Sequence, residues 1–324
     1  MCTAIAYQTK DLYFGRNLDL EYSYMEQVVV MPRNFPLNFR KVPAMNHHYA
    51  MIGMAYVQEN YPLYYDATNE KGLSMAGLNF VGPAAFFPEV QGKDNVAPFE
   101  LIPWILGQCE NLQQARALLE RMNILSESFS TELPIAHLHW MISDKSGSLV
   151  VESMADGLHI RENPVGVLTN NPPFDYQMTH LTDFMNLTPM EPENRFCSDL
   201  FLRTYCRGMG ALGLPGDVSS ASRFVRATFN KIHSKSGETE EESISQFFHI
   251  LASVSMLRGC CDAGNGKYDL TIYSSCCNAD KGIYYYTTYD NCAITGVDMH
   301  KTDLDATTIT AYSLRKDMRI LMEE

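Results

Sequence analysis

The chain has 324 residues, of which 46 % are hydrophobic, and a formal net charge of −13. This length can bury a sizeable core in one large domain or two small ones, and the acidic balance disfavours nucleic acid and anionic membrane surfaces as partners. No apolar run approaches the ~20 residues of a membrane span, and the first residues lack the basic and apolar regions of a signal peptide. We therefore expect a cytoplasmic protein.

The cysteine and histidine positions give no metal-binding pattern. An odd count of nine cysteines in a chain without an export signal favours reduced thiols. Neither Cys260–Cys261 nor Cys276–Cys277 has the two-residue gap of a zinc-binding motif. His137 and His139 lie two apart in a predicted strand, but no third ligand is evident nearby. We predict neither a metal nor a cofactor.

The first predicted element is a hairpin. Residues 4–7 and 12–16 have strand patterns and are separated by a short polar turn. A hairpin of this size brings Arg16 back beside Cys2. A fixed guanidinium next to a thiol favours the thiolate form.

Cys2 directly follows Met1, and its small side chain makes removal of Met1 plausible. Removal places a thiol and a free α-amine on one residue, where they serve as nucleophile and proton acceptor in N-terminal nucleophile catalysis. Asp19 is placed to hydrogen-bond or orient the α-ammonium. Arg16 and Asp19 have opposite parity on an ideal strand, so both face Cys2 only if the chain bends near Asn17. The alternative interpretation is an ordinary buried thiol beside a surface ion pair.

The next elements are strands and then a helix. Strands are predicted over 27–31, 51–57, 63–67 and 73–80, joined by loops that are unusually rich in aromatic residues. Such loops cover a core edge or line a pocket. One long helix is predicted from residue 98 to about 123, because its apolar residues follow the spacing of a single buried stripe.

The rest of the chain continues with the same two kinds of element. Strands are predicted over 137–143, 148–154, 158–161 and 165–169, and a helix over 174–185. Residues 196–256 have a helical pattern, interrupted by a glycine-rich loop at 208–216 and including helices at 220–233 and 241–256. Strands follow at 268–275, 282–288 and 307–314. No linker or repeat divides the chain, so we expect a layered α+β domain with two sheets face to face and helices outside.

The opening Met-Cys-Thr, with Phe-Gly-Arg-Asn-Leu-Asp at 14–19, strongly resembles the choloylglycine hydrolases, N-terminal nucleophile amidases that comprise bile salt hydrolases and penicillin V acylases. Five further blocks occur in the family order: Gly-Leu-Asn-Phe at 77–80, Leu-Thr-Asn-Asn-Pro at 168–172, Leu-Pro-Gly-Asp at 214–217, Ser-Ala-Ser-Arg-Phe at 220–224 and Thr-Ile-Tyr-Ser-Ser-Cys at 271–276. Separated blocks along essentially the whole chain are more specific than any one of them.

The resemblance implies roles for the residues of the N-terminal block. Cys2 matches the nucleophile, exposed by loss of Met1. Arg16 and Asp19 match the positions that set the charge and orientation of the thiol and the amine.

Three positions outside the N-terminal block complete the implied catalytic set. Asn79 matches the side-chain oxyanion donor, and Arg223 matches the remaining active-site arginine. Asn170 matches the asparagine that orients the N-terminal residue, although the adjacent Asn171 leaves the register open by one.

The same resemblance implies a substrate class and an architecture. Asparagine at position 79 favours bile salts, because penicillin V acylases often carry tyrosine there. We expect an apolar wall for the steroid formed by Leu18, Tyr22, Tyr24, Phe129 and Leu133. The family fold is a four-layer αββα N-terminal nucleophile hydrolase fold, expected here as one domain over residues 1–324 and as a homotetramer.

The leading hypothesis is hydrolysis of the amide bond of glycine- or taurine-conjugated bile salts through a Cys2 thioester. One alternative is an acylase for penicillin V or N-acyl homoserine lactones, with the same catalytic residues and a different pocket. Capture of the thioester by another amine would add an acyltransferase side activity. A different class is a non-catalytic binder of bile acids, which loss of Cys2, Arg16 or Asp19 would indicate, and none is lost.

Overall fold

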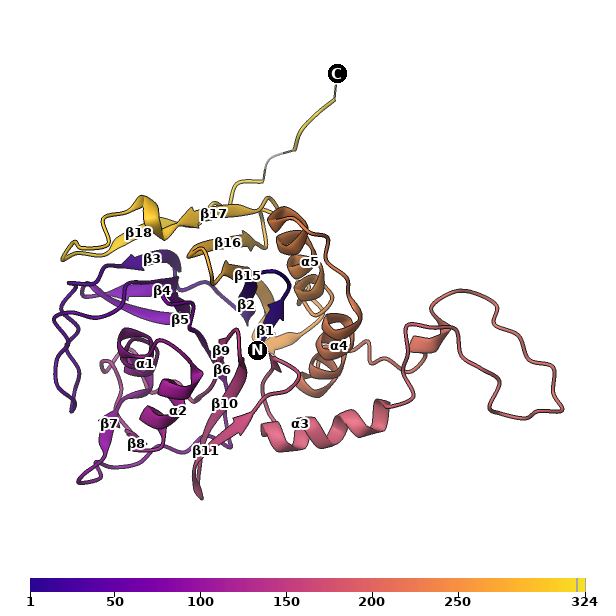
Figure 1. The fold of residues 1–324 in the computed structure, drawn as a ribbon, viewed down its shortest axis with the longest axis horizontal. Coiled ribbons are helices and arrows are strands. Elements are labelled where there is room, and N and C mark those ends of the chain that lie inside the picture. The colour runs from indigo at the N-terminus through magenta and orange to yellow at the C-terminus, as the bar shows by residue number, and fades with distance from the viewer. Residues whose placement is uncertain (319, 324) are drawn as a thin grey trace.

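Two antiparallel sheets form the middle of the molecule (Figure 1). The computed structural model describes residues 1–318 and 320–323. The first sheet has six strands in the order β12 (Val167–Leu168), β1 (Cys2–Gln8), β2 (Leu12–Leu20), β15 (Leu270–Asn278), β16 (Ile283–Thr288) and β17 (Thr295–Asp298). The N-terminal hairpin therefore lies inside this sheet, with β15 paired to its second strand.

The second sheet has eight strands. Their order is β11 (Gly157–Glu162), β10 (Gly147–Met154), β9 (Leu138–Asp144), β6 (Ser74–Asn79), β5 (Tyr61–Asn69), β4 (Met51–Gln58), β3 (Gln27–Met31) and β18 (Thr310–Ser313). Two small pairs lie outside the large sheets: β7 (Asp94–Val96) with β8 (Met122–Ile124), and β13 (Asp262–Gly264) with β14 (Lys267–Tyr268).

The alternation of side chains along β3 shows why the sheets stack. Val28 and Val30 point into the core between the two sheets. Val29 and Met31 point the other way, into a second core beneath α1 (Leu101–Gln108) and α2 (Leu112–Leu119). A strand with apolar side chains on both faces has to be covered on both sides.

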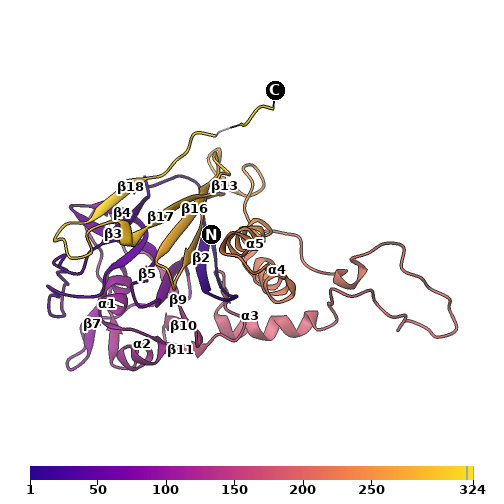
Figure 2. The ribbon, with the colours of Figure 1, turned by 45° about the horizontal axis from the view of Figure 1, so that its top comes forward.

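A second helical layer covers the other sheet. In it, α4 (Ser220–His233) contacts β1 and β12, and α5 (Glu240–Ala252) contacts β2 and β15. Figure 2 shows α1 and α2 on one side of the sheets and α4 and α5 on the other. A shorter helix, α3 (Phe174–His180), lies between β12 and α4 in the chain. The expected four-layer αββα fold is confirmed, whereas the extent of a single domain stays a prediction.

The prediction of one helix over residues 98–123 is wrong. A short 3₁₀ turn (Pro98–Glu100) leads into α1. The helical conformation is then interrupted at residues 109–111, before α2 starts. Asn111 starts α2 by accepting the backbone N–H of Gln114 at 3.0 Å. The apolar spacing continues across this interruption, so the spacing gives no sign of the N-cap that the Asn111 side chain supplies.

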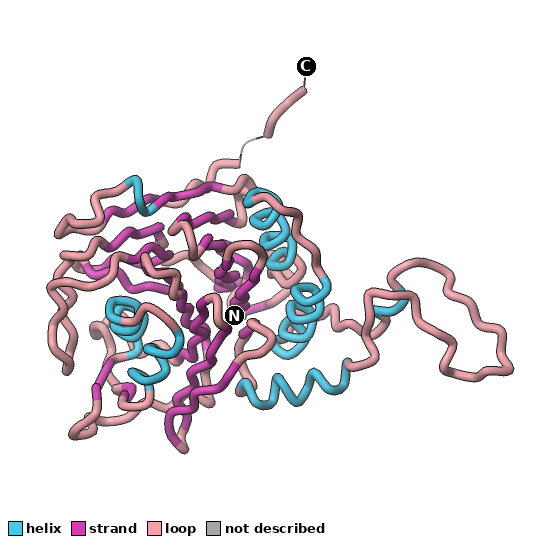
Figure 3. Tube along the Cα trace, in the orientation of Figure 1, coloured by secondary structure: helices cyan, strands magenta, loops and turns pink. Residues whose placement is uncertain are grey.

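The helical pattern predicted for residues 196–207, before the predicted glycine-rich loop at 208–216, is also wrong. Residues 196–219 are irregular apart from a 3₁₀ turn at Met209–Ala211. Residues 186–216 extend away from the body of the molecule as a loop, which we call the arm (Figure 3). Large apolar side chains of the arm are exposed, among them Phe196, Phe201 and Tyr205, each at least 80 %. An apolar pattern there does not mark a buried helix face.

None of the helices in the described part of the chain has the length and apolarity needed to cross a bilayer.

Candidate active site

The predicted N-terminal hairpin is confirmed and is longer than expected. Cys2 pairs with Leu18 and Ala4 with Arg16, so Arg16 lies two positions along from Cys2 on the same face of the sheet. Gly15 allows β2 to approach β15, because a Cβ there would lie 2.0 Å from the carbonyl oxygen of Ser275. The close approach fixes the strand that carries Arg16.

Arg16 is fully buried between the sheets. Its Nη1 donates to the carbonyl oxygens of Tyr65 (3.2 Å) and Gly77, so it bonds to the backbones of β5 and β6 in the opposite sheet. Burial acts to lower the pKa of Arg16, but Cys2 and other acidic neighbours outweigh it, and the net pKa is raised. The guanidinium therefore stays charged in electrostatic reach of the Cys2 thiol.

Asp19 lies near the end of β2, where the register with β15 shifts between Thr271 and Tyr273. Its Oδ1 accepts the hydroxyl of Thr271 at 2.6 Å, and that hydroxyl accepts the N–H of Met256 at 2.8 Å. Burial raises the pKa of Asp19, and the Arg223 guanidinium and the Thr271 hydroxyl oppose the rise. Among the residues that the structure describes, Asp19 Oδ2 is buried without a hydrogen-bond partner.

The backbone nitrogen of Cys2 is held by a side chain. It donates to Asn170 Oδ1 at 2.8 Å, and Arg223 Nη2 donates to the same oxygen at 2.7 Å. Arg223 Nη1 also donates to the carbonyl oxygen of Cys2 and to Thr3 Oγ1 at 2.6 Å. Burial lowers the pKa of Arg223, whereas the neighbouring Asp19 and Cys2 raise it.

The geometry distinguishes Asn170 from its neighbour. The side chain of Asn171 donates to the carbonyl oxygen of Val81 and does not reach Cys2. Asn170 Nδ2 donates to the carbonyl oxygen of Asn79 at 2.7 Å, so Asn79 lies beside the same carboxamide at the end of β6. The Asn79 side chain is exposed. The structure thus brings the six predicted catalytic residues together around the end of the hairpin.

The five residues predicted for the apolar wall fall into separate places. Leu18 is buried directly opposite Cys2. Tyr22 and Tyr24 are exposed just after β2, with their hydroxyls 2.8 Å apart.

Phe129 packs in another cluster, 5.3 Å from Phe99 and 5.8 Å from Tyr61 between ring centroids. Leu133 is partly exposed in the same loop as Phe129, and its backbone N–H donates to Ser130 Oγ at 3.2 Å. No hydrogen bond or ring contact among the described residues joins Phe129 or Leu133 to Cys2.

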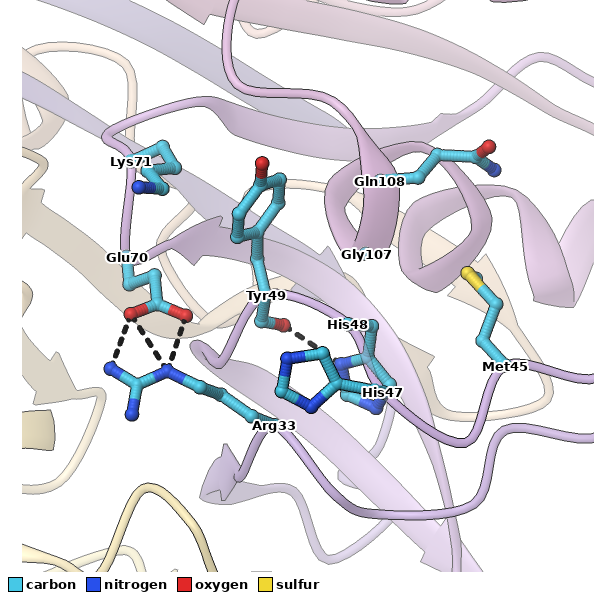
Figure 4. A pocket seen from close by; sticks show the side chains of 9 residues that line it. All are labelled: Arg33, Met45, His47, His48, Tyr49, Glu70, Lys71, Gly107 and Gln108. Carbon is cyan, nitrogen blue, oxygen red and sulfur yellow. Dashed lines mark hydrogen bonds and ion pairs between the residues drawn. The ribbon is translucent and has the colours of Figure 1, made fainter.

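A surface pocket of about 540 Å³ lies away from these residues, beside the C-terminal end of α1 (Figure 4). Its lining includes Arg33, His48, Tyr49, Glu70 and Gly107. Its main charged groups are already paired, since Arg33 Nη2 lies 2.6 Å from Glu70 Oε2. None of the predicted catalytic residues lines it, so it is not the candidate site.

Some residues that build the site were not predicted. Ser220 Oγ accepts the backbone N–H of Asn170 at 2.8 Å, and Thr271 holds Asp19. Both lie in sequence blocks that the resemblance singled out, which was the signal available for them. Fully buried His139 bonds Glu152 and the carbonyl oxygen of Thr169, each at 3.0 Å.

His139 therefore fixes the backbone just after β12, next to Asn170, through its bond to Thr169. His137, its predicted strand neighbour, is exposed and stacks on Phe86. In residues 1–318 and 320–323, no cluster of three or more His, Cys, Asp or Glu side chains is arranged to hold a metal ion.

The sequence and structure resemble those of known amidases. Residues 2–312 match the family described as linear amide C–N hydrolases, choloylglycine hydrolase family. The chain is 52 % identical over 317 residues to a bile salt hydrolase/transferase of Lactiplantibacillus plantarum, covering 98 % of each chain. A mutant conjugated bile acid hydrolase from Clostridium perfringens superposes with a TM-score of 0.92 at 37 % identity, over 100 % of both chains.

A penicillin V acylase from Agrobacterium tumefaciens has the same fold, with a TM-score of 0.76 at 21 % identity over 96 % of this chain and 90 % of the acylase. The four layers and the site at the N-terminal hairpin thus define an N-terminal nucleophile hydrolase fold. The chain belongs to the choloylglycine hydrolase family and is an amide hydrolase.

Proposed function

We propose that the protein hydrolyses the amide bond of glycine- or taurine-conjugated bile salts, releasing bile acid and amino acid through a thioester on Cys2. One observation carries the proposal. The Cys2 nitrogen, which becomes the α-amine on removal of Met1, already donates a hydrogen bond to Asn170 Oδ1. Arg223 donates to the same oxygen. The bile salt hydrolase/transferase named above supports the substrate class.

The mechanism uses groups that the site places around Cys2. The thiol proton passes to the α-amine, and the thiolate, favoured by Arg16, attacks the amide carbon. The Asn79 side chain, together with a backbone N–H, stabilises the oxyanion, and such a donor contributes ~3 kcal/mol to transition-state stabilisation. The α-ammonium then protonates the leaving amine, and water hydrolyses the thioester with the α-amine as base.

Asp19 fits the role of holding the α-ammonium. It offers a buried oxygen that has no partner among the described residues, on the face of β2 where Arg223 and Thr271 converge. Met1, where it is retained, donates from its amine to the carbonyl oxygen of Asp19. The mechanism requires its removal, since an acylated Cys2 nitrogen cannot accept a proton.

The aromatic pair Tyr22 and Tyr24 is the best-placed part of the proposed apolar wall, because it follows directly from the strand that carries Arg16 and Asp19. A flat steroid face suits exposed aromatic rings. Capture of the thioester by another amine would make the protein an acyltransferase as well, in line with the hydrolase/transferase similar to it.

We also propose a cytoplasmic homotetramer. All nine cysteines are free, which suits a reducing compartment. The arm exposes several large apolar side chains outside any core, and such surface in a folded protein indicates burial against another chain.

The test is to incubate the purified protein, with loss of Met1 confirmed by intact mass, with glycocholate, taurocholate and penicillin V. The released amine is followed, and Cys2→Ser is the control. We expect release from the bile salts that the control abolishes. Release from penicillin V alone would assign the acylase activity instead. No release from any substrate, with the thiol reduced, would leave a non-catalytic bile acid binder or another amide class.

A further inference from the structure

A buried carboxylate outside the predicted catalytic set lies between the two sheets. Asp66, on β5, is 2 % exposed. Its Oδ1 accepts the hydroxyl of Tyr273 at 2.8 Å, and its Oδ2 accepts those of Tyr284 (2.6 Å) and Ser275 (3.3 Å). These three donors come from β15 and β16 of the opposite sheet.

The three hydroxyls around Asp66 favour its ionised form, because each can donate to the carboxylate. Both carboxylate oxygens accept hydroxyl protons, which is the pattern of an acceptor-only group. Burial raises the pKa of Asp66; the Arg16 guanidinium and the three hydroxyls oppose the rise, and the net pKa stays above its ordinary value. Burial also raises the pKa values of Tyr273 and Tyr284, so both phenols stay protonated and act as donors.

Arg16 connects this carboxylate to the reactive thiol. Ser275 Oγ accepts the backbone N–H of Arg16 at 3.1 Å and donates to Asp66, so one hydroxyl bridges the two residues. Arg16 also bonds the carbonyl oxygen of Tyr65, the residue before Asp66. Both Cys2 and Asp66 raise the pKa of Arg16.

We propose that Asp66 is the counter-ion of Arg16 and limits how strongly Arg16 favours the thiolate form of Cys2. The inference rests on the proposed role of Cys2 as the nucleophile. A guanidinium between two acidic groups stabilises each of them, while the two negative charges disfavour one another. Asp66 is therefore a positioning residue that sets the net positive potential at the thiol.

Other ionisable groups near these residues do not replace Asp66 in this role. Asp66 faces Arg16 on β2, Tyr273 and Cys277 on β15, and Tyr284 on β16. Both cysteine and tyrosine neighbours are neutral at working pH, because burial raises their pKa values.

Around the thiol, Arg223 on α4 adds a second positive charge, with Cys261 and Asp19 near it. Asp19 also raises the pKa of Arg16, but less than Asp66 does, and its carboxylate accepts the hydroxyl of Thr271.

The test measures thiol reactivity and needs no substrate. Protein with Met1 removed is alkylated with iodoacetamide across pH, and modification of Cys2 is followed by peptide mass spectrometry. In Asp66→Asn the carboxamide keeps the shape of the side chain and loses its charge. We expect the pH midpoint of Cys2 alkylation to fall by about one unit, which raises the alkylation rate below the midpoint roughly tenfold.

A midpoint that stays in place or rises would overturn the proposal, since a loss of packing alone supplies no reason for a lower midpoint. Tyr284→Phe is a second test that keeps the carboxylate in place. It removes a donor that favours the ionised form of Asp66, so the pKa of Asp66 rises and the midpoint of Cys2 alkylation is expected to fall, as in Asp66→Asn. An unchanged or higher midpoint contradicts the inference. Tyr64→Phe is the matched control, because its hydroxyl donates to the carbonyl oxygen of Val29 on the other face of β5.

The outcomes separate this inference from the proposed function. Cys2 that alkylates no faster than the other thiols in the unsubstituted protein would overturn both. Preferential alkylation of Cys2 with a midpoint insensitive to Asp66→Asn would overturn the counter-ion alone.

Discussion

The backbone nitrogen of Cys2 donates to the side chain of Asn170 at 2.8 Å, across 168 residues of chain. The donor is the first backbone N–H of β1, and the acceptor is a side-chain oxygen. The bond places the nitrogen that the proposed mechanism uses as a base beside Asn79 and Arg223.

Asn170→Ala should lower kcat by about 100-fold with a small effect on KM, because the variant loses the group that orients the proposed base. Steady-state hydrolysis of a conjugated bile salt measures the effect. Asn171→Ala is the matched control, since its side chain contacts Val81 instead. Equal losses in the two variants would contradict the assignment of Asn170.

His139→Leu should destabilise the fold by about 3 kcal/mol, because the buried carboxylate of Glu152 then keeps only the backbone N–H of Phe174 as a donor. Urea unfolding at one fixed protein concentration measures the loss. The double variant His139→Leu with Glu152→Leu should recover much of it, since it removes the uncompensated charge. His137→Leu, an exposed neighbour, should change stability by no more than ~0.5 kcal/mol. A single variant His139→Leu as stable as the unsubstituted protein would show that the pair is not needed for stability.

Lys231 should make the fold more stable as the pH rises. Its ammonium donates to the carbonyl oxygen of Val165 at 2.7 Å, and burial lowers its pKa to about 8. Between pH 8 and the unfolded value near ~10.4 the unfolded chain binds more protons than the folded chain, so the free energy of unfolding increases with pH.

Lys231→Met removes the titrating group. The free energy of unfolding of the unsubstituted protein, minus that of Lys231→Met, should increase by about 1–3 kcal/mol from pH 7 to pH 10. Denaturant titrations in the presence of a reductant measure this difference. A difference that is constant over the range would refute the burial effect.

The arm should form the contacts between subunits of the proposed homotetramer. Replacement of Phe196, Phe201 and Tyr205 by serine should shift the protein to smaller species in analytical ultracentrifugation, with unchanged circular dichroism. These side chains contribute exposed apolar area and nothing to the core. Ile232→Ser on α4, also exposed, is the control. A triple variant that sediments like the unsubstituted protein would place the interface elsewhere.

Local patterns in the sequence predicted the hairpin and α4, because each has its whole signal within a short window. Cys2 and Arg16 are joined by a tight turn, and Ser219 caps α4 at the predicted start. The apolar stripe over 98–123 led to the wrong prediction of a single helix, because the stripe continues through the N-cap at Asn111. The arm misled for a related reason: its apolar side chains look like a helix face but are not buried.

The residues around the site that sequence patterns missed depend on distant partners. Asp66 meets Tyr273 across 207 residues, and His139 meets Thr169 across 30. A lone aspartate in a strand pattern gives no indication of which sheet it faces. The resemblance supplied the predicted catalytic set, and only the fold shows that Arg16 bonds the opposite sheet whereas Asp19 bonds Thr271 on the neighbouring strand.

The pairing of β2 with β15 also sets when activity can begin. Asp19 accepts a hydrogen bond from Thr271, which lies 252 residues further along the chain and is therefore synthesised later. At ~5–20 residues per second a ribosome takes roughly 13–50 s to cover that distance. A chain still being synthesised thus carries the proposed nucleophile without the partners that complete the site, and its first residues stay open to processing during that interval. The site is therefore complete only late in synthesis, once β15 has joined the sheet.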